Sequence, residues 1–387
     1  MTPSARAQAA IDILEQVIAS ARDDGPPADQ LVSRYFKTRR YAGSGDRRAV
    51  RELVFQAIRS SDRPESGRSA LLAVAGAAAL FDGSPHGPAL VEPGEVQAEQ
   101  RFIPQWIEPL LSAHVTSDEW PALAERAPLD VRVNAARADR GSLVDQFEGA
   151  EPTRLSPWGL RLPIDQRVDD HPAYASGLIE VQDEGSQLIA LACASKAGER
   201  LLDLCAGAGG KALALAAAAP GATILASDTN RDRLSKLGPR AERAGAAIET
   251  RLLNPPREVE ELADWTNRAD MVLVDAPCSG SGTWRRNPEG RWRLTPQRLD
   301  RLEAVQAQLL DIAAGQVAPG GRLIYAVCSL LSREGAGQIA AFRTRHSSWI
   351  SETVPIEGGR EDGGGRLLTP AHDGTDGFFV ACLRRPC

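Results

Sequence analysis

The sequence lacks features that define three large classes of protein. It has no run approaching the roughly 18 uninterrupted apolar residues needed to span a bilayer. Its first twenty residues are amphipathic and carry acids, which fits neither a secretory signal nor a membrane anchor. Its six cysteines are too few for a disulfide scaffold in 387 residues, and none forms a C-x-x-C pair. We therefore expect a cytoplasmic protein with free thiols, without a structural zinc site or any other metal, and without membrane contact.

Composition and charge narrow the classes further. With 43% hydrophobic and 25% charged residues, the chain matches ordinary soluble globular proteins, and its length allows two or three domains. A net charge of −6 argues against non-specific coating of nucleic acid. Two stretches are nevertheless basic. Residues 34–59 hold eight bases against two acids, and residues 284–301 hold six arginines against two acids, with Trp284 and Trp292 between them. Such patches suit phosphate contacts and base stacking, although a solvated, salt-bridged face is the favoured interpretation for either patch taken alone.

Hydrophobic periodicity divides the chain into three parts. Residues 1–98 are predicted to be a helical domain with a Gly/Pro-rich linker after Phe81, including a buried helix over 69–81. Residues 99–176 show short mixed elements and predict a small α+β module. Residues 177–387 alternate strand-like and helix-like segments, which indicates an α/β, Rossmann-like domain with a mostly parallel seven-stranded sheet. The expected strands are 201–204, 223–227, 248–253, 271–274, 322–326, 349–354 and 378–383, and residues 357–375 are expected to form a surface loop.

A glycine-rich turn follows the first of these strands. The segment from Leu201 to Lys211 reads strand, turn and helix, and its glycines allow close approach of a ligand to free backbone N–H groups. It matches neither G-x-G-x-x-G nor a P-loop, which disfavours dinucleotides and nucleoside triphosphates. Asp228 ends the next strand, where such folds place a carboxylate that binds ribose hydroxyls. Lys211 at a helix start needs a nearby anion, which a ligand carboxylate would supply. Adenosine plus an amino-acid carboxylate describes S-adenosylmethionine; glycines present only for packing are the alternative.

Two cysteines lie in matching settings. Cys278 in Asp-Ala-Pro-Cys-Ser-Gly and Cys328 in Tyr-Ala-Val-Cys-Ser-Leu each follow a short apolar run that reads as a buried strand. Because residues past the carboxyl ends of parallel strands line one crevice, both thiols are expected to face it. Two thiols at one cleft suggest covalent chemistry.

Several motifs in order resemble the Nop/Sun family of S-adenosylmethionine-dependent RNA cytosine-C5 methyltransferases, and most closely its bacterial ribosomal-RNA branch. The matching segments are Val181–Leu188, Asp203–Lys211, Asp275–Gly282, Arg285–Glu289 with Trp292, Tyr325–Ser329 and Asp376–Phe379. Upstream, Arg132-Val133-Asn134 is similar to the family's small RNA-binding module, and the helical start is similar to a shortened NusB-like RNA-binding domain. The resemblance thus implies an RNA partner, with ribosomal RNA favoured over transfer RNA, and we expect a monomer.

The resemblance also implies roles for individual residues. Cys328 becomes the nucleophile and Cys278 the thiol that assists product release. The implied cofactor contacts are Cys205, Ala206, Gly207, Ala208, Gly209, Gly210, Lys211, Asp228 and Asp275. The chain departs from the family pattern in two places: Val327 stands where a threonine is common, and Asn254 stands where the family has an acid that contacts adenine. Asn254 is still able to hydrogen-bond adenine.

The implied chemistry needs these residue types. Carbon 5 of cytosine is a poor nucleophile, and a thiolate that adds to carbon 6 activates it. Asp275, beside Cys278, could hold the amino edge of the base during this addition, or could merely cap the following turn. The expected function is therefore methyl transfer to carbon 5 of a cytosine, in 16S ribosomal RNA or alternatively in transfer RNA. Three rivals stay open: a DNA cytosine methyltransferase that uses Cys278 as nucleophile, a non-catalytic RNA-binding assembly factor, and a nicotinamide-dependent oxidoreductase.

Overall fold

The computed structural model describes residues 1–23 and 25–387, which group into two compact units. Unit 1 contains Met1–Leu110, Trp120–Glu125 and Thr283–Pro296; unit 2 contains Leu111–Glu119, Arg126–Gly282 and Gln297–Cys387. The expected domain limits at residues 98 and 176 stay a prediction. Within the described ranges, no helix has both the length and the apolar character that crossing a membrane requires.

Unit 1 is helical, as the apolar periodicity predicts. Its elements are α1 (Pro3–Arg22), α2 (Ala28–Lys37), α3 (Ser44–Ser60), α4 (Gly67–Leu72), α5 (Trp120–Ala124), α13 (Gly290–Arg293) and the 3₁₀ turns η1 (Ala77–Leu80) and η2 (Glu108–Leu110). Thr2 caps α1 by accepting a hydrogen bond from the Ala5 amide at 3.1 Å. Val50, Val54 and Ile58 on α3 are buried in the core formed with α1 and α4. The helix predicted over 69–81 is wrong in its length, because α4 ends at Leu72 and a turn separates it from η1.

The arginine- and tryptophan-rich segment 284–293 is part of the core of unit 1. Trp284 and Arg291 are almost fully buried, and Trp292 belongs to the helical core. The Arg291 guanidinium donates to the Ile58 carbonyl and, at 2.8 Å, to the Ser61 carbonyl. The last carbonyls of a helix have no partner within the helix, and a cation suits that end of the helix dipole. The prediction that this segment forms an exposed base-stacking surface is therefore wrong for these three side chains.

A small antiparallel sheet opens unit 2. It contains β1 (Leu129–Val133), β2 (Glu151–Pro152), β3 (Gly159–Leu162) and β4 (Ile179–Val181) in the order β2-β3-β1-β4, with η3 (Ser117–Glu119), α6 (Arg140–Val144) and α7 (Pro172–Ala175) beside it in sequence. Val131 pairs with Leu160 on one side and with Val181 on the other. The sheet has its own apolar core, which includes Val131 and Leu160. The strands expected near 131–133 and 159–162 are confirmed.

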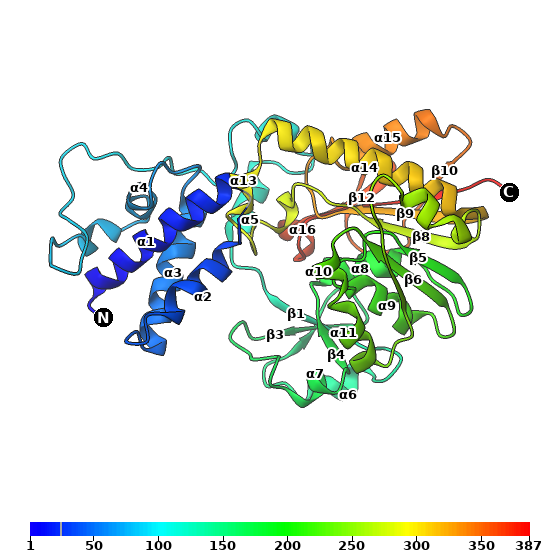
Figure 1. Ribbon diagram of the computed structural model, residues 1–387, viewed down its shortest axis with the longest axis horizontal. Helices are drawn as coiled ribbons and strands as arrows, with labels where there is room; N and C mark the ends of the chain where they lie inside the picture. The colour runs from blue at the N-terminus through cyan, green and yellow to red at the C-terminus, as the bar shows by residue number, and fades with distance from the viewer. Residues whose placement is uncertain (24) are drawn as a thin grey trace. The chain divides into compact units, whose positions relative to one another are not determined.

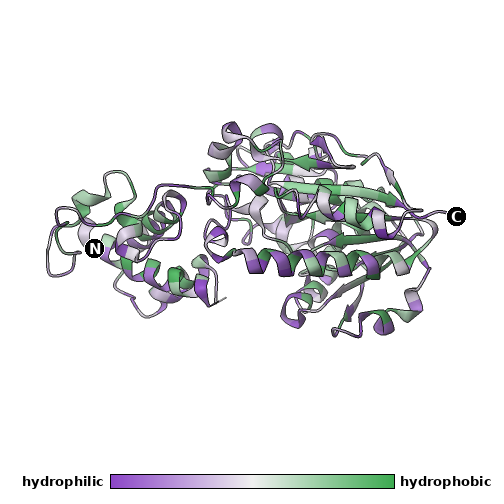
Figure 2. Ribbon diagram, turned by 90° about the horizontal axis from the view of Figure 1, so that it is seen from above, coloured by the Kyte–Doolittle hydropathy of each residue, from purple (hydrophilic) through white to green (hydrophobic). Residues whose placement is uncertain are grey.

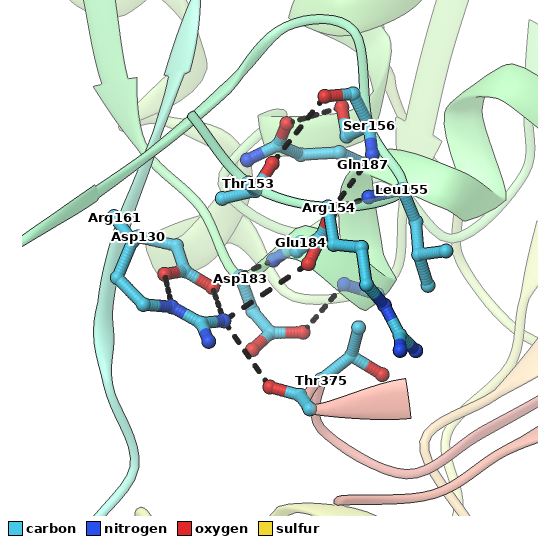
Figure 3. Close-up of polar contacts among 12 residues, drawn as sticks. Asp130, Thr153, Arg154, Leu155, Ser156, Arg161, Asp183, Glu184, Gln187 and Thr375 are labelled. Atoms are coloured by element: carbon cyan, nitrogen blue, oxygen red, sulfur yellow. Dashed lines mark hydrogen bonds and ion pairs between the residues drawn. The ribbon is translucent and has the colours of Figure 1, made fainter. Parts of the chain in front are cut away.

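Carboxylates join this small sheet to α8 (Glu184–Ala192), the helix that follows β4 (Figure 3). The buried carboxylate of Glu184 accepts hydrogen bonds from the backbone amides of Leu155 at 2.5 Å and Ser156 at 2.8 Å. Asp130 on β1 forms a two-point ion pair with Arg161 on β3, at 2.8 and 3.0 Å, and accepts from the Glu184 amide at 3.2 Å. The motif Val181–Leu188 thus supplies the contacts that fix the small sheet against α8.

The large sheet of unit 2 has nine strands among the residues described. They are β5 (Arg200–Asp203), β6 (Thr223–Asp228), β7 (Glu249–Leu252), β8 (Ala269–Asp275), β9 (Val317–Val327), β10 (Ile350–Glu352), β11 (Arg360–Asp362), β12 (Gly365–Leu368) and β13 (Phe378–Arg384). Their order is β11-β12-β13-β9-β8-β5-β6-β7, with β10 paired to β13. The pairs from β9 to β7 are parallel, and the remaining pairs are antiparallel. After β5 the chain builds one half of the parallel region, and from β8 onward it builds the other half. A topological switch point therefore lies between β5 and β8.

Helices cover both faces of the sheet, which confirms the Rossmann-like α/β fold (Figure 1). α8 and α9 (Gly210–Ala218) lie on one face and share a core with β5, β8, β9 and β13, whereas α14 (Pro296–Gln316) and α15 (Ala336–Arg345) lie on the other. The central strands are coloured hydrophobic and the helices show both colours, as expected for strands buried on two sides (Figure 2). Shorter elements are α10 (Arg231–Leu234), α11 (Leu237–Ala244), α12 (Glu258–Glu261), η4 (Ala263–Trp265), η5 (Ser281–Thr283) and α16 (Pro370–Asp373).

All seven expected strands are present, and two more occur where a loop was predicted. β11 and β12 form a hairpin within residues 357–375, joined by Gly363 and Gly364, which both have positive φ. A two-residue hairpin turn of this kind requires that backbone conformation at both central positions, which glycine adopts without strain. The predicted surface loop is therefore partly a hairpin at the edge of the sheet.

Candidate active site

Three residues expected to carry the chemistry, together with Asp203, lie at the ends of four neighbouring parallel strands of unit 2. Asp203 ends β5, Asp228 ends β6, Asp275 ends β8, and Cys328 follows directly after β9. Asp203 pairs in register with Ala226 of β6 and Leu273 of β8, so these strand ends lie at one edge of the sheet. The switch point between β5 and β8 falls in the middle of this group, where open α/β sheets bind their ligands.

The glycine-rich turn packs against the end of β6. The Asp228 carboxylate accepts hydrogen bonds from the amides of Gly207 and Asn230, both at 2.7 Å. Gly209 has φ +84°, and a side chain there would collide with Leu237. The turn therefore presents bare backbone next to a buried acid, an arrangement that fits the ribose and backbone contacts of a nucleoside ligand.

Asp203 has the most perturbed carboxyl of this edge. It is buried, and neither of its carboxylate oxygens makes a well-formed hydrogen bond among the residues described. Burial, together with the charge of Asp275, raises the pKa of Asp203 to about 7. A buried carboxyl without a partner suits a cationic ligand group such as an ammonium, because such a group would favour its ionised form.

Lys211 finds its anion within the protein. Its Nζ lies 2.7 Å from Oδ2 of Asp275, and neither side chain is widely exposed. Burial lowers the pKa of Lys211, but the charge of Asp275 and this hydrogen bond outweigh burial, and the net pKa is raised. The expectation that a ligand carboxylate neutralises Lys211 is thus unnecessary, because Asp275 already does so. The pair places a fixed cation and a fixed anion beside the cysteines.

The two thiols meet. Sγ of Cys278 lies 3.4 Å from Sγ of Cys328, and both residues are partly accessible. The hydrogen bond with Cys328 and burial raise the pKa of Cys278 well above its usual value, and the charge of Glu334 adds to this rise. The Cys278 thiol therefore keeps its proton at neutral pH, and either sulfur is able to donate in this contact. The two thiols lie next to each other, and the expectation that both face one ligand-binding crevice stays a prediction.

The other predicted residues differ in their surroundings. Burial raises the pKa of Cys205 well above its usual value, so its thiol stays protonated. Asn254 lies in the exposed segment after β7, and its side-chain amide donates to Glu261 at 2.9 Å. Val327 is fully buried at the end of β9 and pairs with Phe379. Of these three residues, Cys205 lies in the turn itself, whereas Asn254 is already occupied by Glu261.

A carboxylate that was not predicted from the sequence contacts both cysteine loops. Glu334 is fully buried and accepts hydrogen bonds from Ser279, which follows Cys278, and from Ser329, which follows Cys328. The repeated Cys-Ser pair was a visible signal for the serines. No pattern marks Glu334, because its partners converge only in the folded chain.

Comparison with known proteins decides the family. The family described as 16S rRNA methyltransferase RsmB/F matches residues 190–384. The ribosomal RNA small subunit methyltransferase B of Enterobacter sp. (strain 638) is 33% identical over 295 residues, which cover 74% of this chain and 67% of that protein. The protein of the same name from Salmonella typhi is 33% identical over 299 residues, with the same coverage of both chains. The chain belongs to the RsmB/F family. It is thus an RNA methyltransferase, and the resemblance to the Nop/Sun family is confirmed.

Solved structures share the fold with this RsmB/F family member. The crystal structure of PH0851 aligns with a TM-score of 0.78 at 21% identity and covers 100% of this chain and 99% of that chain. The structure of NSun6 from Pyrococcus horikoshii with SFG has a TM-score of 0.64 at 18% identity and covers 73% and 97% of the two chains. Both support the same fold class.

Proposed function

We propose that this chain transfers a methyl group from S-adenosylmethionine to carbon 5 of a cytosine in 16S ribosomal RNA, through a covalent bond between Cys328 and carbon 6. The observation that carries this proposal is the pair of thiols 3.4 Å apart, following the adjacent parallel strands β8 and β9. Membership of the RsmB/F family supports the ribosomal substrate. A cytoplasmic monomer is the working state we infer.

The proposed cofactor site is the edge formed by Asp203, the turn from Cys205 to Lys211, and Asp228. The solved NSun6 structure contains SFG, an analogue of S-adenosylmethionine, which supports a cofactor of this class. Bare backbone at the turn, an acid at the end of β6 and an unpartnered buried carboxyl at Asp203 suit ribose hydroxyls and an ammonium group. When bound, S-adenosylmethionine supplies an electrophilic methyl group. Asn254 as an adenine contact stays a prediction, since its amide is bonded to Glu261.

The protein's own groups would carry the steps on cytosine. The Cys328 thiolate would form a bond to carbon 6, and the electron pair displaced from the carbon 5–carbon 6 double bond would let carbon 5 bond to the methyl carbon, as the bond from that carbon to the cofactor sulfur breaks. A base removes the proton from carbon 5, and the sulfur–carbon 6 bond then breaks, which restores aromaticity and frees the thiolate. Cys278 holds a proton next to Cys328 and is placed to assist this release. Asp275, fixed by Lys211, is placed to hold the amino edge of the base.

Methyl transfer to RNA from cells that lack the gene tests the proposal. Purified protein, labelled S-adenosylmethionine and this RNA are incubated, and the RNA is then digested to nucleosides and separated. We expect label in 5-methylcytidine for the wild-type protein and none for Cys328→Ala. Label in another nucleoside, or no label at all, would contradict the proposal and favour a different site of methylation or a non-catalytic binder.

The choice between ribosomal and transfer RNA needs a second measurement. Bisulfite sequencing of RNA from wild-type and deletion cells locates each cytosine that resists bisulfite conversion in wild-type RNA and is converted in RNA from the deletion cells. A site in 16S ribosomal RNA is the expected result. Loss confined to transfer RNA would move the substrate to the other class and leave the chemistry unchanged.

A further inference from the structure

Glu334 is a buried carboxylate that the proposed chemistry does not use. It lies in the turn between β9 and α15, and its side chain is fully buried. A buried carboxylate is costly unless hydrogen bonds or a cation compensate its charge. Within residues 1–23 and 25–387, no ion pair is formed by Glu334, so hydrogen bonds to neutral groups hold it.

Four groups donate hydrogen bonds to the Glu334 carboxylate. Oε1 accepts from the Ser279 amide at 2.8 Å and from Nε2 of Gln306 at 2.9 Å. Oε2 accepts from the Ser279 hydroxyl and, at 2.5 Å, from the Ser329 hydroxyl. An ionised carboxylate offers about four acceptor positions, so this one is saturated. Its donors come from the loop after β8, the loop after β9 and helix α14.

Further hydrogen bonds connect the loop after β8 to the loop after β9. Ser281 accepts from the Leu330 amide at 2.8 Å, and the Ser279 and Ser329 hydroxyls lie 3.2 Å apart. Nε2 of Gln306 also donates to the Pro277 carbonyl at 2.9 Å, next to Cys278. Each cysteine is therefore followed in the chain by a serine that hydrogen-bonds to Glu334. The carboxylate thus contacts the residue next to each of the two cysteines.

We propose that Glu334 is a positioning residue that sets the distance between the Cys278 and Cys328 sulfur atoms by clamping the serines that follow them. The clamp acts through backbone geometry, and Glu334 touches neither sulfur nor any reacting atom. Its consequence for catalysis rests on the proposed function above, whereas its effect on the sulfur pair does not.

Substitutions separate the clamp from the charge. In Glu334→Gln, the amide oxygen keeps the Oε1 partners, and the new NH₂ group faces two hydroxyls that are able to reverse and accept. Glu334→Gln therefore keeps the clamp and loses the charge. Glu334→Ala loses both, and Ser329→Ala is a milder variant that removes one hydroxyl from Oε2. Glu303→Ala is the matched control, because Glu303 is a nearby glutamate whose carboxylate accepts from Arg333, and its bonds among the residues described include neither cysteine and neither of the serines that follow them.

A trivalent arsenical measures the sulfur pair without reference to catalysis. Phenylarsine oxide bridges two close thiols by forming two As–S bonds, and the two thiol protons leave with its oxygen as water. We expect the wild type to bind it through Cys278 and Cys328, so that Cys278→Ala and Cys328→Ala each abolish bridging. The affinity for phenylarsine oxide is expected to fall about 10-fold or more in Glu334→Ala and to fall less in Ser329→Ala, by analogy with the sensitivity of aligned groups to displacements of about 1 Å. In Glu334→Gln and Glu303→Ala it is expected to stay within about threefold of wild type.

Turnover measurements on RNA complete the test. For Glu334→Ala we expect kcat to fall about 100-fold with little change in KM for RNA, and Glu334→Gln should recover most of that loss. Circular dichroism and thermal melting establish that each variant is folded, and Ser329→Ala replaces Glu334→Ala if the latter is not. Wild-type arsenical affinity in folded Glu334→Ala and Ser329→Ala would overturn the proposal, and so would the absence of bridging in the wild type. Normal bridging with no methylation by the wild type would instead contradict the proposed function alone.

Discussion

Replacing Asp203 with asparagine should remove a pH dependence of stability that this carboxyl imposes. Burial and the charge of Asp275 raise its pKa from 3.8 to about 7. The folded-state pKa of Asp203 lies above its unfolded-state value. The protonated carboxyl therefore makes its full contribution to the free energy of unfolding below about pH 3.8, and this contribution is lost as pH rises through about 7. Between about pH 5.5 and about pH 8.5, the loss from this one group amounts to about 2 kcal/mol.

The assay is urea unfolding of the wild type and of Asp203→Asn at these two pH values. The difference in unfolding free energy between the two proteins should shift by about 2 kcal/mol in favour of the variant at the higher pH. The constant cost of burying an amide cancels from this comparison. Ser235→Ala, an exposed change without a titrating group, should show no such shift. A difference for Asp203→Asn that stays within about 0.5 kcal/mol across the range would refute the burial argument.

Three further outcomes follow from the structure. Glu334→Gln removes a negative charge near Cys278, so the pKa of that thiol should fall and its alkylation by iodoacetamide should begin at lower pH; unchanged alkylation would contradict this. Arg291→Ala leaves helix carbonyls of unit 1 buried without a donor and should lower the free energy of unfolding in urea by about 2 to 4 kcal/mol. A decrease under about 0.5 kcal/mol would show that the contacts are dispensable. Replacing the exposed Arg47 and Arg51 of α3 with alanine should weaken RNA binding and reduce its logarithmic salt slope by about 2; an unchanged slope would exclude this face from phosphate contact.

The sequence predicted the elements that depend on local pattern. Short apolar runs such as Met271–Val274 identified the inner strands of the parallel region, because strands buried on both faces leave few polar positions. The outer parallel strand β7 is polar and partly exposed, so this reason does not apply to it. The β11–β12 hairpin was missed even though Gly363-Gly364 is a hairpin signal. Its flanks, including Arg360–Asp362, lack the alternating hydrophobic pattern that usually accompanies such a turn.

The candidate site was predicted where strand ends fix it and missed where distant segments converge. The position of Cys278 and Cys328 after adjacent strands follows from the fold, so their meeting was foreseeable. Glu334 was not, because its hydrogen bonds join loops that are separated by 55 residues in the case of Ser279. The burial of Arg291 was also unforeseen, since only the folded unit shows that helix carbonyls surround it.

Trapping on RNA that contains 5-fluorocytosine identifies the nucleophile, because fluorine at carbon 5 cannot leave as a proton does and the enzyme–base bond persists. Protease digestion and mass spectrometry then identify the modified cysteine. We expect the adduct to form on Cys328, to disappear in Cys328→Ala, and to persist or accumulate in Cys278→Ala. An adduct on Cys278 that survives in Cys328→Ala would contradict this expectation and would assign the nucleophile as in the DNA methyltransferase alternative.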